Sequence, residues 1–572
     1  MANLLDEASI LLTPTAYNNG SMLAVKPENG DGDFTFSRNS AATRVNAQGL
    51  VENVQILSSN LVSNGDFSQE GSELVTNGDF SNGLNDWTLN TSAIGFIDTS
   101  LSTLQYLPNH GDYAEVKQLN NSIIGKTYKV NFEVISKGSN AVVYIYYGRD
   151  AVYIGDIDDI SIGLHTAYVT SVHSDGFSIS VRTNGIIEID NISVKEVGQD
   201  WTLGTGWSIG DGKAVAISSP SGARLQQSNV FTVGKTYKIT YEITEITQGA
   251  IGVYVGGVFL TTQSSVGSYT EIKTITSNST LYVRASGTTT ASVTNISVLE
   301  ITDDTNLPRI DYTDGCGSLL LEPQSTNLYL NSDTLVTQSN ATSASAYTVS
   351  FYGTGTITFS GTHTGTLVGT GLNDRVSVTF TATSGTLIST ISGSCTKGQL
   401  ENLTYATSYI PTQGAISTRL RDIANNSGNA SLINSEEGVL YAEIATLAND
   451  TIQQIGIYGD SSIKQIRIEI NNSSVRAHLY NGSYQASMSS TQTVTNFNKI
   501  AFKYKVNDFS LWINGLKVAT DNSGNTFSAN TIDRLNLTNF NGSTNLVKAK
   551  TKALAVYKTA LTDEQLTLLT TI

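Results

Sequence analysis

The chain has 572 residues, a formal net charge of −16 and 14% charged residues, against about 25% in an average soluble protein. It contains 50 Gly but only 7 Pro, together with 26 Tyr and 17 Phe. Long helices and coiled coils are excluded, because they need Ala, Glu, Lys, Leu and Arg as about half of the chain. Disorder is excluded by the aromatic and β-branched content, which suffices for cores. The composition predicts an all-β protein whose strands expose Thr and Ser and whose turns use Asn and Gly.

The charge balance also excludes two classes of partner. The 33 Lys and Arg residues form no basic stripe of the kind that a phosphate backbone requires, so we expect no nucleic acid. No apolar run approaches the roughly 18 residues of a membrane span, so we expect no membrane insertion. Asp6 and Glu7 stand where a signal peptide carries basic residues. The two cysteines, Cys316 and Cys395, are too few for a disulfide framework, which favours folding in a reducing cytosol with two thiols or at most one bridge.

The first segment, residues 1–60, contains the run 33–51 (DFTFSRNSAATRVNAQGLV). This run resembles a segment that recurs in large bacteriophage virion proteins. Its usual neighbours there are runs like 306–312 (NLPRIDY) and 319–327 (LLLEPQSTN), which here lie far downstream. The resemblance implies that residues 1–60 pack with residues 305–330 and that the stretch between them is an insertion. We expect residues 1–60 to attach the protein to the virus particle.

Internal repeats fill the stretch between these segments. An octapeptide at 61–68 (LVSNGDFS) recurs almost unchanged at 74–81 (LVTNGDFS). Three longer-range pairs follow in the same order: 86–89 (DWTL) with 200–203, 125–134 (GKTYKVNFEV) with 234–243 (GKTYKITYEI), and 191–197 (NISVKEV) with 295–301 (NISVLEI). Because the pairs are collinear, they predict two homologous modules in tandem, which we place at 61–198 and 199–304.

Each module alternates apolar and polar residues with a period of two, which is typical of strands with one buried face. The NGDF run, the following Trp, the GKTY run and the closing DNISV run resemble the jelly-roll carbohydrate-binding modules of glycanases and surface proteins. The resemblance implies a β-sandwich fold and sugar binding for both modules.

That family often holds a structural calcium ion near its first and last strands. Asp79 and Asp190 match those positions in the first module, whereas the second module has Thr294 in place of Asp190. The resemblance therefore implies a calcium site formed by Asp79 and Asp190 in the first module and makes one doubtful in the second. The same residues equally fit a plain turn.

Aromatic side chains are the expected sugar contacts, because a sugar ring stacks on a flat side chain at little ordering cost. The candidates are Tyr144, Tyr146, Trp207 and Trp512. Core packing is the competing role for each of them. Trp87 and Trp201 recur at equivalent positions, which favours a core role for both, whereas Trp207 has no counterpart and is the better ligand candidate.

Residues 331–412 alternate cleanly at 347–352, 356–360 and 376–381, with Gly-rich turns between them, and predict a third β-sandwich. The run 399–411 (QLENLTYATSYIP) again resembles the bacteriophage proteins. Residues 413–435, which contain the sequence NNSGN, are expected to form a linker.

The last segment, residues 436–572, contains the run 509–518 (FSLWINGLKV), in which Asn514 and Gly515 fit a tight hairpin turn. Thr562 and Gln565 fit a capping box at the start of a short C-terminal helix. The segment resembles concanavalin A-like and laminin-G-like lectin sandwiches.

No catalytic constellation emerges. Ser208 lies in a Gly-x-Ser-x-Gly run but lacks the following helix that a nucleophile elbow requires. The five histidines lack metal-ligand spacing. Asp156, Asp158 and Asp159 fit a surface turn or a cation site better than a glycosidase pair. We therefore expect no enzyme, and a polysaccharide depolymerase is disfavoured.

Together these features predict an all-β protein of the bacteriophage particle, of head-fibre or tail-fibre type, which binds host or environmental glycans weakly and multivalently. Its expected partners are capsid or tail proteins, glycans and further copies of itself, with a trimer as the expected oligomer. The alternative is a capsid decoration or stabilising protein that binds no sugar.

Overall fold

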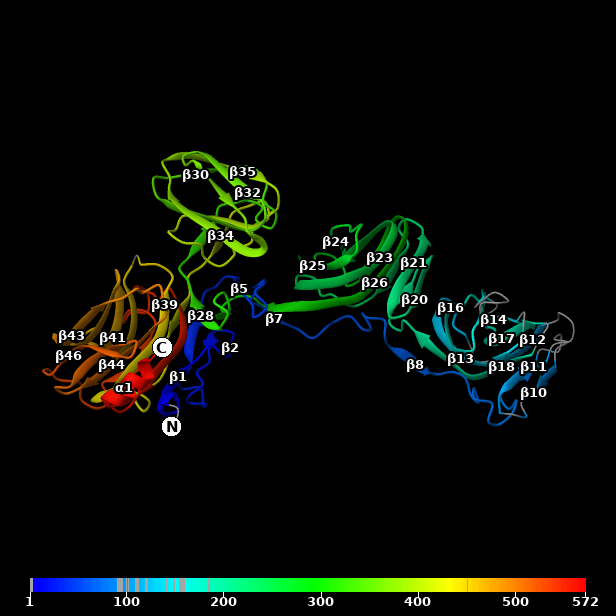
Figure 1. The fold of residues 1–572 in the computed structure, drawn as a ribbon, viewed down its shortest axis with the longest axis horizontal. Helices are drawn as coiled ribbons and strands as arrows, with labels where there is room; N and C mark the ends of the chain where they lie inside the picture. The colour runs from blue at the N-terminus through cyan, green and yellow to red at the C-terminus, as the bar shows by residue number, and fades with distance from the viewer. Residues whose placement is uncertain are drawn as a thin grey trace. The chain divides into compact units, whose positions relative to one another are not determined.

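The computed structural model describes residues 4–89, 96–98, 100, 102–107, 113–118, 122–138, 141–147, 150–153, 160–183, 186–449 and 451–571. Antiparallel sheets dominate this part of the chain, and α1 (Asp563–Thr570) and the 3-10 helix η1 (Leu4–Glu7) are the helices in it (Figure 1). The all-β prediction with a short C-terminal helix is therefore confirmed. No helix of the described part is long and apolar enough to cross a membrane. The chain divides into two compact units, residues 57–302 and residues 1–56 with 303–572.

The unit 57–302 contains two modules, one inserted into the other. The inner module is residues 70–197, and the outer module is residues 57–68 together with 199–302. The strands of the inner module are β8 (Glu70–Glu73), β9 (Thr88–Leu89), β10 (Phe96–Asp98), β11 (Leu104–Leu107), β12 (Tyr113–Gln118), β13 (Thr127–Lys137), β14 (Ala141–Tyr147), β15 (Asp150–Tyr153), β16 (Gly163–Thr170), β17 (Phe177–Thr183) and β18 (Ile187–Val197). Those of the outer module are β7 (Ile56–Leu57), β19 (Thr202–Leu203), β20 (Trp207–Gly210), β21 (Lys213–Ser219), β22 (Arg224–Gln227), β23 (Thr236–Val255), β24 (Val258–Phe259), β25 (Gly267–Thr274) and β26 (Leu281–Asp303).

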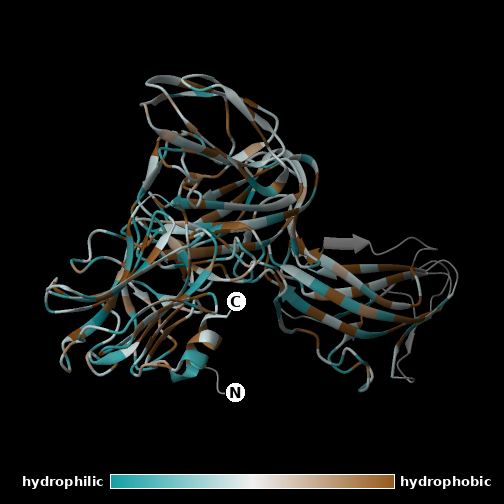
Figure 2. Ribbon diagram, turned by 60° about the vertical axis from the view of Figure 1, so that its left-hand side comes forward, coloured by the Kyte–Doolittle hydropathy of each residue, from teal (hydrophilic) through white to brown (hydrophobic). Residues whose placement is uncertain are grey.

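The inner module has two sheets, ordered β10-β11-β18-β13-β16 and β15-β14-β17-β12-β9, and β8 also pairs with β18. Val130 and Phe132 of β13 meet Val143 and Ile145 of β14 in the core between the sheets. Figure 2 shows the hydrophobic and hydrophilic residues alternating along such strands. The period of two in the sequence is therefore the in-and-out alternation of a sandwich.

The outer module is organised by two long strands, β23 and β26, which pair along most of their length. One row of strands has the order β19-β22-β26-β21-β20. β23 also pairs with β26, and β24 and β25 pair with β23. Matching contacts relate the two modules: the Asn191 amide donates to the Glu133 carboxylate at 2.9 Å, and the Asn295 amide donates to the Glu242 carboxylate at 2.8 Å. The sequence repeat thus corresponds to a repeated structure.

The two copies of the octapeptide lie in different modules. Phe67, from the first copy, packs on Trp201 with ring centroids 5.3 Å apart, and Phe80, from the second copy, packs on Trp87 at the same distance. The first copy therefore completes the second repeat, and residues 61–68 belong to the outer module instead of opening a module at 61–198. The difference arises because the whole inner module lies, in the chain, between the first copy and Trp201, the residue on which Phe67 packs.

The other unit combines the N-terminal segment with the C-terminal half of the chain. Its strands outside the two sandwiches are β1 (Ile10–Leu12), β2 (Tyr17–Asn18), β3 (Ser21–Met22), β4 (Phe34–Ser37), β5 (Thr43–Val45), β6 (Val51–Asn53), β27 (Arg309–Asp311), β28 (Ser318–Leu321), β29 (Ser325–Asn327), β37 (Ser417–Arg419) and β38 (Ile423–Asn425). Residues 413–435 were expected as a linker, but β37 pairs with β29 and β38 pairs with β4. This segment is thus sheet structure that ties distant parts of the chain together.

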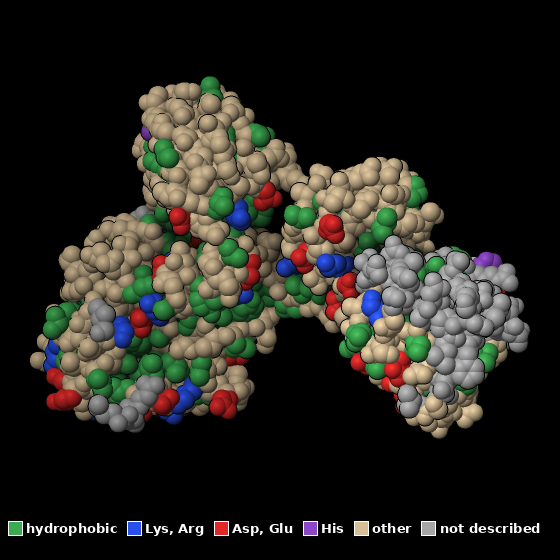
Figure 3. Space-filling view, turned by 45° about the vertical axis from the view of Figure 1, so that its right-hand side comes forward, with side chains coloured by type: hydrophobic (Ala, Val, Ile, Leu, Met, Phe, Trp, Pro, Cys, Tyr) green, Lys and Arg blue, Asp and Glu red, His purple; other side chains and the backbone are tan. Residues whose placement is uncertain are grey.

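The middle sandwich, residues 331–412, consists of β30 (Gln338–Thr342), β31 (Ala346–Gly353), β32 (Thr356–Gly361), β33 (Gly365–Val368), β34 (Gly371–Thr381), β35 (Gly385–Ser392) and β36 (Cys395–Glu401). Its sheets have the orders β30-β35-β32-β33 and β34-β31-β36. Its charged residues are Asp333, Asp374, Arg375, Lys397 and Glu401. Figure 3 shows its surface, at the top of the view, as mostly uncharged polar and backbone atoms.

The C-terminal sandwich is built from β39 (Glu437–Thr446), β40 (Gln453–Gly459), β41 (Lys464–Asn471), β42 (Ser474–Asn481), β43 (Tyr484–Thr491), β44 (Asn498–Lys505), β45 (Phe509–Ile513), β46 (Leu516–Asp521), β47 (Ile532–Asn536) and β48 (Ala549–Tyr557). One sheet has the order β43-β42-β41-β40-β47, and the other has β27-β28-β48-β39-β44-β45-β46, with β1 also paired to β48. Ile10, Phe34 and Leu319 share its core cluster. The N-terminal segment is therefore part of this sandwich.

Two local predictions for the C-terminal sandwich are confirmed. Asn514 and Gly515 have φ angles of 52° and 83°, as a tight hairpin turn requires. Thr562 and Gln565 form a reciprocal capping box at the start of α1. Leu566 of α1 then lies in one buried cluster with Trp512, so the helix covers the outer side of this sheet.

The runs that resemble bacteriophage proteins meet in a buried charge cluster. Arg38 Nη1 lies 3.1 Å from Asp422 Oδ1, Arg309 pairs with both Glu322 and Asp422, and Arg419 pairs with Glu322. All five side chains are at most 3% exposed. Burial lowers the pKa of the Arg38 guanidinium to about 10, although Asp422 opposes this shift. The cluster joins residues that lie hundreds of positions apart in the chain.

Candidate functional site

The inner module presents two tyrosines on the outer face of its second sheet. Because Val143 and Ile145 of β14 point into the core, Tyr144 and Tyr146 point outward, and both are half-buried. Their ring centroids are 6.3 Å apart with an interplanar angle of 28°. Both residues were predicted from the sequence as sugar contacts, and the structure places them side by side on one face.

The neighbouring strands supply the polar groups of this face. Ser180 of β17 lies opposite Tyr144 and also opposite Glu115 of β12, while Ser178 lies opposite Tyr146 and Lys117. We call these six residues the tyrosine face: Glu115, Lys117, Tyr144, Tyr146, Ser178 and Ser180. The serines are small and buried, and Glu115 and Lys117 add one acidic and one basic side chain to this face. Aromatic rings beside hydroxyls and single charges suit a polar ligand with flat apolar faces.

The outer module carries a corresponding face. Tyr254 of β23 lies opposite Tyr282 of β26 and opposite Phe259 of β24, and Arg284 lies opposite Arg224 of β22. We call the following residues the arginine–tyrosine face: Arg224, Gln226, Tyr254, Phe259, Tyr282 and Arg284. Their apolar neighbours on the same strands lie in the core of the outer module, so these side chains point outward.

Cations and rings interleave on the arginine–tyrosine face. The guanidinium of Arg224 lies 4.3 Å from the ring centroid of Tyr282, and that of Arg284 lies 5.6 Å from the ring of Tyr254. Arg284 Nη1 also donates to the Tyr254 hydroxyl at 3.0 Å. Phe259 is 47% exposed, and its centroid lies 4.6 Å from that of Tyr254. This face is aromatic like the tyrosine face but carries two cations.

A shared anchor shows that the two faces are equivalent. The Gln118 carboxamide oxygen accepts from the Thr76 amide at 3.2 Å, and the Gln227 oxygen accepts from the Ser63 amide at 2.9 Å. When positions are counted from these glutamines across the paired strands, Tyr254 of the outer module corresponds to Tyr146 of the inner module. Arg224, Tyr282 and Arg284 of this face were not predicted from the sequence. The alternation of polar and apolar residues at 224–227 (RLQQ) and 281–284 (LYVR) was the signal that could have indicated them.

The tryptophan candidates have core positions. Trp207 is 4% exposed in the core of the outer module, and Trp512 is 5% exposed beneath α1. The expectation that they contact sugar is therefore corrected, because neither offers a free ring face. Trp87 and Trp201 are buried, as their recurrence predicted.

The two residues expected to hold calcium lie near each other. Burial raises the pKa of the Asp190 carboxyl, and the charges of Asp79 and Glu133 raise it further. Asp79 instead accepts from the backbone and hydroxyl of Ser81 at 3.2 and 3.0 Å, which lowers its pKa. Across the described residues, no group of three or more His, Cys, Asp or Glu is arranged to hold a metal ion.

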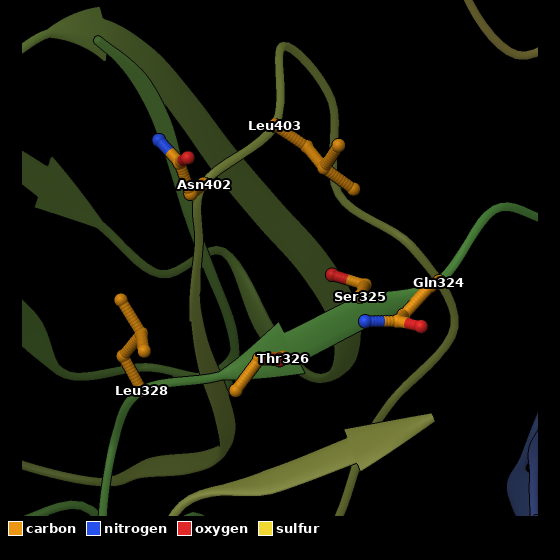
Figure 4. Close-up of a pocket in the computed structure, with 6 residues that line it drawn as sticks. All are labelled: Gln324, Ser325, Thr326, Leu328, Asn402 and Leu403. Carbon is orange, nitrogen blue, oxygen red and sulfur yellow. The ribbon is translucent and has the colours of Figure 1, made fainter. Parts of the chain in front are cut away.

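Further cavities lie elsewhere in the part of the chain that the structure describes. A cavity of about 170 Å³ lies between β29 and the loop after β36; Figure 4 shows Gln324, Ser325, Thr326, Leu328, Asn402 and Leu403 around it. One of about 410 Å³ adjoins the first octapeptide copy, at Asn64, Asp66 and Asn295. One of about 470 Å³ adjoins Ser473 and Gln492 in the C-terminal sandwich. The residues that line these cavities are mixed polar and apolar and include no cluster of catalytic groups.

The remaining candidates for chemistry are placed as follows. Ser208 lies in β20 and is followed by the hairpin to β21, without the helix of a nucleophile elbow. Asp156, Asp158 and Asp159 lie outside the described residues. Cys316 and Cys395 are free thiols, exposed and buried respectively.

No protein-family model matches the chain, and no curated protein matches it. Solved structures with similar parts include the CBM40 module of Ruminococcus gnavus IT-sialidase, at 19% identity over 26% of this chain and 93% of that one, with a TM-score of 0.22. The tandem CBM22-1–CBM22-2 domain of Paenibacillus barcinonensis Xyn10C is 10% identical over 41% and 99%, with a TM-score of 0.20. Domains LG4-5 of the mouse laminin α1 chain are 11% identical over 79% and 88%, with a TM-score of 0.15. These values assign neither a family nor an activity.

Proposed function

We propose that this protein is a structural component of a bacteriophage particle, of head-fibre or tail-fibre type, that holds the particle to host or environmental glycans. Binding is weak at each site and multivalent, because one chain carries equivalent faces on two modules and an appendage assembles several chains. The protein acts by adhesion and carries out no reaction on the glycan.

The observation that carries the glycan part is the paired tyrosine face and arginine–tyrosine face. Both occupy the same outer sheet surface in repeated modules, and Tyr146 and Tyr254 take corresponding positions. Rings fixed on a sheet lose little entropy when a sugar stacks on them, and neighbouring hydroxyls and charges supply hydrogen bonds.

The virion part rests on the runs that resemble bacteriophage proteins. Arg38, Arg309, Glu322 and Arg419 lie in or next to those runs and join in the buried charge cluster. The resemblance therefore concerns a packed unit of the fold, not separate stretches of chain. The two modules are inserted in the chain between the two parts of this unit. This arrangement suits adhesive modules carried by a domain that is attached to the particle.

A glycan-array experiment with the full-length chain tests the glycan part. We expect binding to a subset of bacterial capsule, mucin or plant glycans, weakened at least tenfold by Tyr146→Ala and by Tyr254→Ala. Tyr269→Ala is the matched control, because Tyr269 is a half-buried tyrosine of the outer module on β25, away from both faces. Silence across the array, or equal loss in the control, would favour a decoration protein that binds no sugar. Immunogold imaging of intact particles tests the virion part, which is wrong if particles carry no label.

A further inference from the structure

A third polar face lies on the C-terminal sandwich, on the sheet β43-β42-β41-β40-β47. Ile466 and Ile468 of β41 and Ala477 of β42 point into the core. The residues that alternate with these core residues along β41 and β42 point outward, and Tyr484 of β43 pairs with Tyr480 on the same side. We call the following set the basic face: Arg467, Glu469, Arg476, His478, Tyr480 and Tyr484. No sequence motif marked this face.

Charges on the basic face do not cancel. Arg467 Nε lies 3.6 Å and Arg476 Nη1 lies 3.4 Å from the carboxylate of Glu469. Gln454 Nε2 donates to the same carboxylate at 3.1 Å. Two guanidinium groups thus share one carboxylate, which leaves one positive charge in excess. The side chain of Arg476 is 41% exposed, so this excess is accessible from solvent in a chain whose net charge is −16.

His478 lies directly opposite Arg467 in the β41–β42 pair. Burial, together with the charges of Arg467 and Arg476, lowers the pKa of its imidazole to about 4, while Glu469 opposes this shift. The ring is therefore neutral at pH 7. Its buried Nδ1 has no hydrogen-bond partner among the described residues, and such unpaired buried polar atoms are rare in proteins.

An aromatic wall borders these groups. Tyr484 is 56% exposed, and its ring centroid lies 5.1 Å from that of His478 and 5.2 Å from that of Tyr480. Arg467 Nη2 donates to the Tyr484 hydroxyl at 3.3 Å. An exposed ring therefore stands next to a cation whose charge is only partly paired.

We propose that the basic face binds a saccharide that carries a carboxylate, with the carboxylate on Arg476 and Arg467 and the sugar ring against Tyr484. Guanidinium groups recognise carboxylates through paired charge-assisted hydrogen bonds. A sugar is favoured over an acidic peptide because the cations adjoin an exposed flat ring. A nucleic acid is disfavoured because two arginines do not form the extended basic stripe that a phosphate backbone requires. The site is separate from the faces of the two modules and stands independently of the function proposed for them.

The test measures binding of the full-length chain to immobilised saccharides that contain uronic or sialic acids and to the same saccharides after carboxyl reduction. We expect the acidic forms to bind at least tenfold more tightly than the reduced forms. Arg476→Gln and Tyr484→Ala should each remove most of this preference, and both side chains are exposed enough to be replaced without unfolding. Lys505→Gln is the matched control, because Lys505 is an exposed cation of the other sheet, paired with Glu437.

A second readout follows the His478 ring by NMR. A bound carboxylate should raise the imidazole pKa above its value in the free protein, because it offsets Arg467 and Arg476. Equal binding of acidic and reduced forms, unchanged binding by Arg476→Gln, or binding of DNA or acidic peptides in preference to saccharides would each overturn the proposal. If neutral glycans still bind through Tyr146 and Tyr254, the proposed adhesive function stands without this site.

Discussion

Trp201 donates its indole N–H to the main-chain carbonyl of Asn64 at 3.1 Å, across 137 residues of intervening chain. Trp87 makes the same bond to Asn77 at 2.9 Å over 10 residues. The two bonds are equivalent parts of the two modules, but the first closes the outer module around the whole inner module. The insertion leaves the outer module dependent on a contact between its two separated pieces.

Replacing Trp201 with Phe should destabilise the outer module selectively. The ring stays apolar, but the Asn64 carbonyl loses its donor, which costs about 1–2 kcal/mol of unfolding free energy. Hydrogen exchange resolved along the chain should show faster opening in residues 199–302 and unchanged protection in 122–138. Trp87→Phe is the matched variant and should show the reverse. Equal losses in both modules from either variant would contradict separate cores.

The octapeptide glycine should tolerate no side chain. A Cβ at Gly65 would overlap the carbonyl oxygen of Ile296 on β26, so Gly65→Ala must push the segment off the strand. We expect a loss of about 3 kcal/mol or more in unfolding free energy, measured by denaturant unfolding. Gly234→Ala is the control in the same module: its φ is +88° with no atom within 4 Å of a Cβ, which costs only about 1–2 kcal/mol. A smaller loss at Gly65 than at Gly234 would show that the close approach is wrong.

The buried charge cluster should be sensitive to loss of a single carboxylate. Asp422→Asn leaves Arg38 and Arg309 without their shared partner, and breaking a buried pair in this way costs about 3–5 kcal/mol. We expect a clear drop in the thermal midpoint of the unit 1–56 with 303–572. Asp460→Asn provides the comparison, because its ion pair with Lys464 is exposed and should leave the midpoint unchanged. An unchanged midpoint for Asp422→Asn would refute a structural role for the cluster.

Acidification should destabilise the C-terminal sandwich through His478. The fold lowers the imidazole pKa from 6.5 to about 4, so between these pH values the unfolded chain binds more protons than the folded one. Stability should therefore fall as the pH drops from 6.5 to 4, by less than about 1.4 kcal/mol per pH unit, the limit for one proton. The groups that face the ring are Arg467, Glu469, Arg476 and Tyr484. His478→Gln should flatten this part of the stability profile, measured by urea unfolding at several pH values, and an identical slope in the variant would contradict the assignment.

The features that were predicted correctly from the sequence depend on residues that are close together in the chain. The all-β class follows from alternation, because the side-chain period of a strand is visible within a few residues. The Asn514–Gly515 turn and the Thr562–Gln565 capping box depend on neighbouring backbone groups only. Tyr144 and Tyr146 share a face for the same reason, since residues two apart on a strand point the same way.

The basic face and the arginine–tyrosine face were not predicted because they combine strands. Arg467 and His478 meet only through the register of β41 and β42, and Arg224 meets Tyr282 only through the pairing of β22 with β26. The roles expected for Trp207 and Trp512 were wrong for a related reason. Each ring is buried by elements that lie elsewhere in the chain.

The sequence by itself determined that this protein is all-β, acidic, sparsely charged and internally repeated. Only the tertiary structure decided which copy of the octapeptide belongs to which module. The copies at 61–68 and 74–81 differ at a single position, Ser63 against Thr76, so their local preferences are the same. The choice between Trp87 and Trp201 depends on which strands close each sandwich, and that is a property of long-range packing.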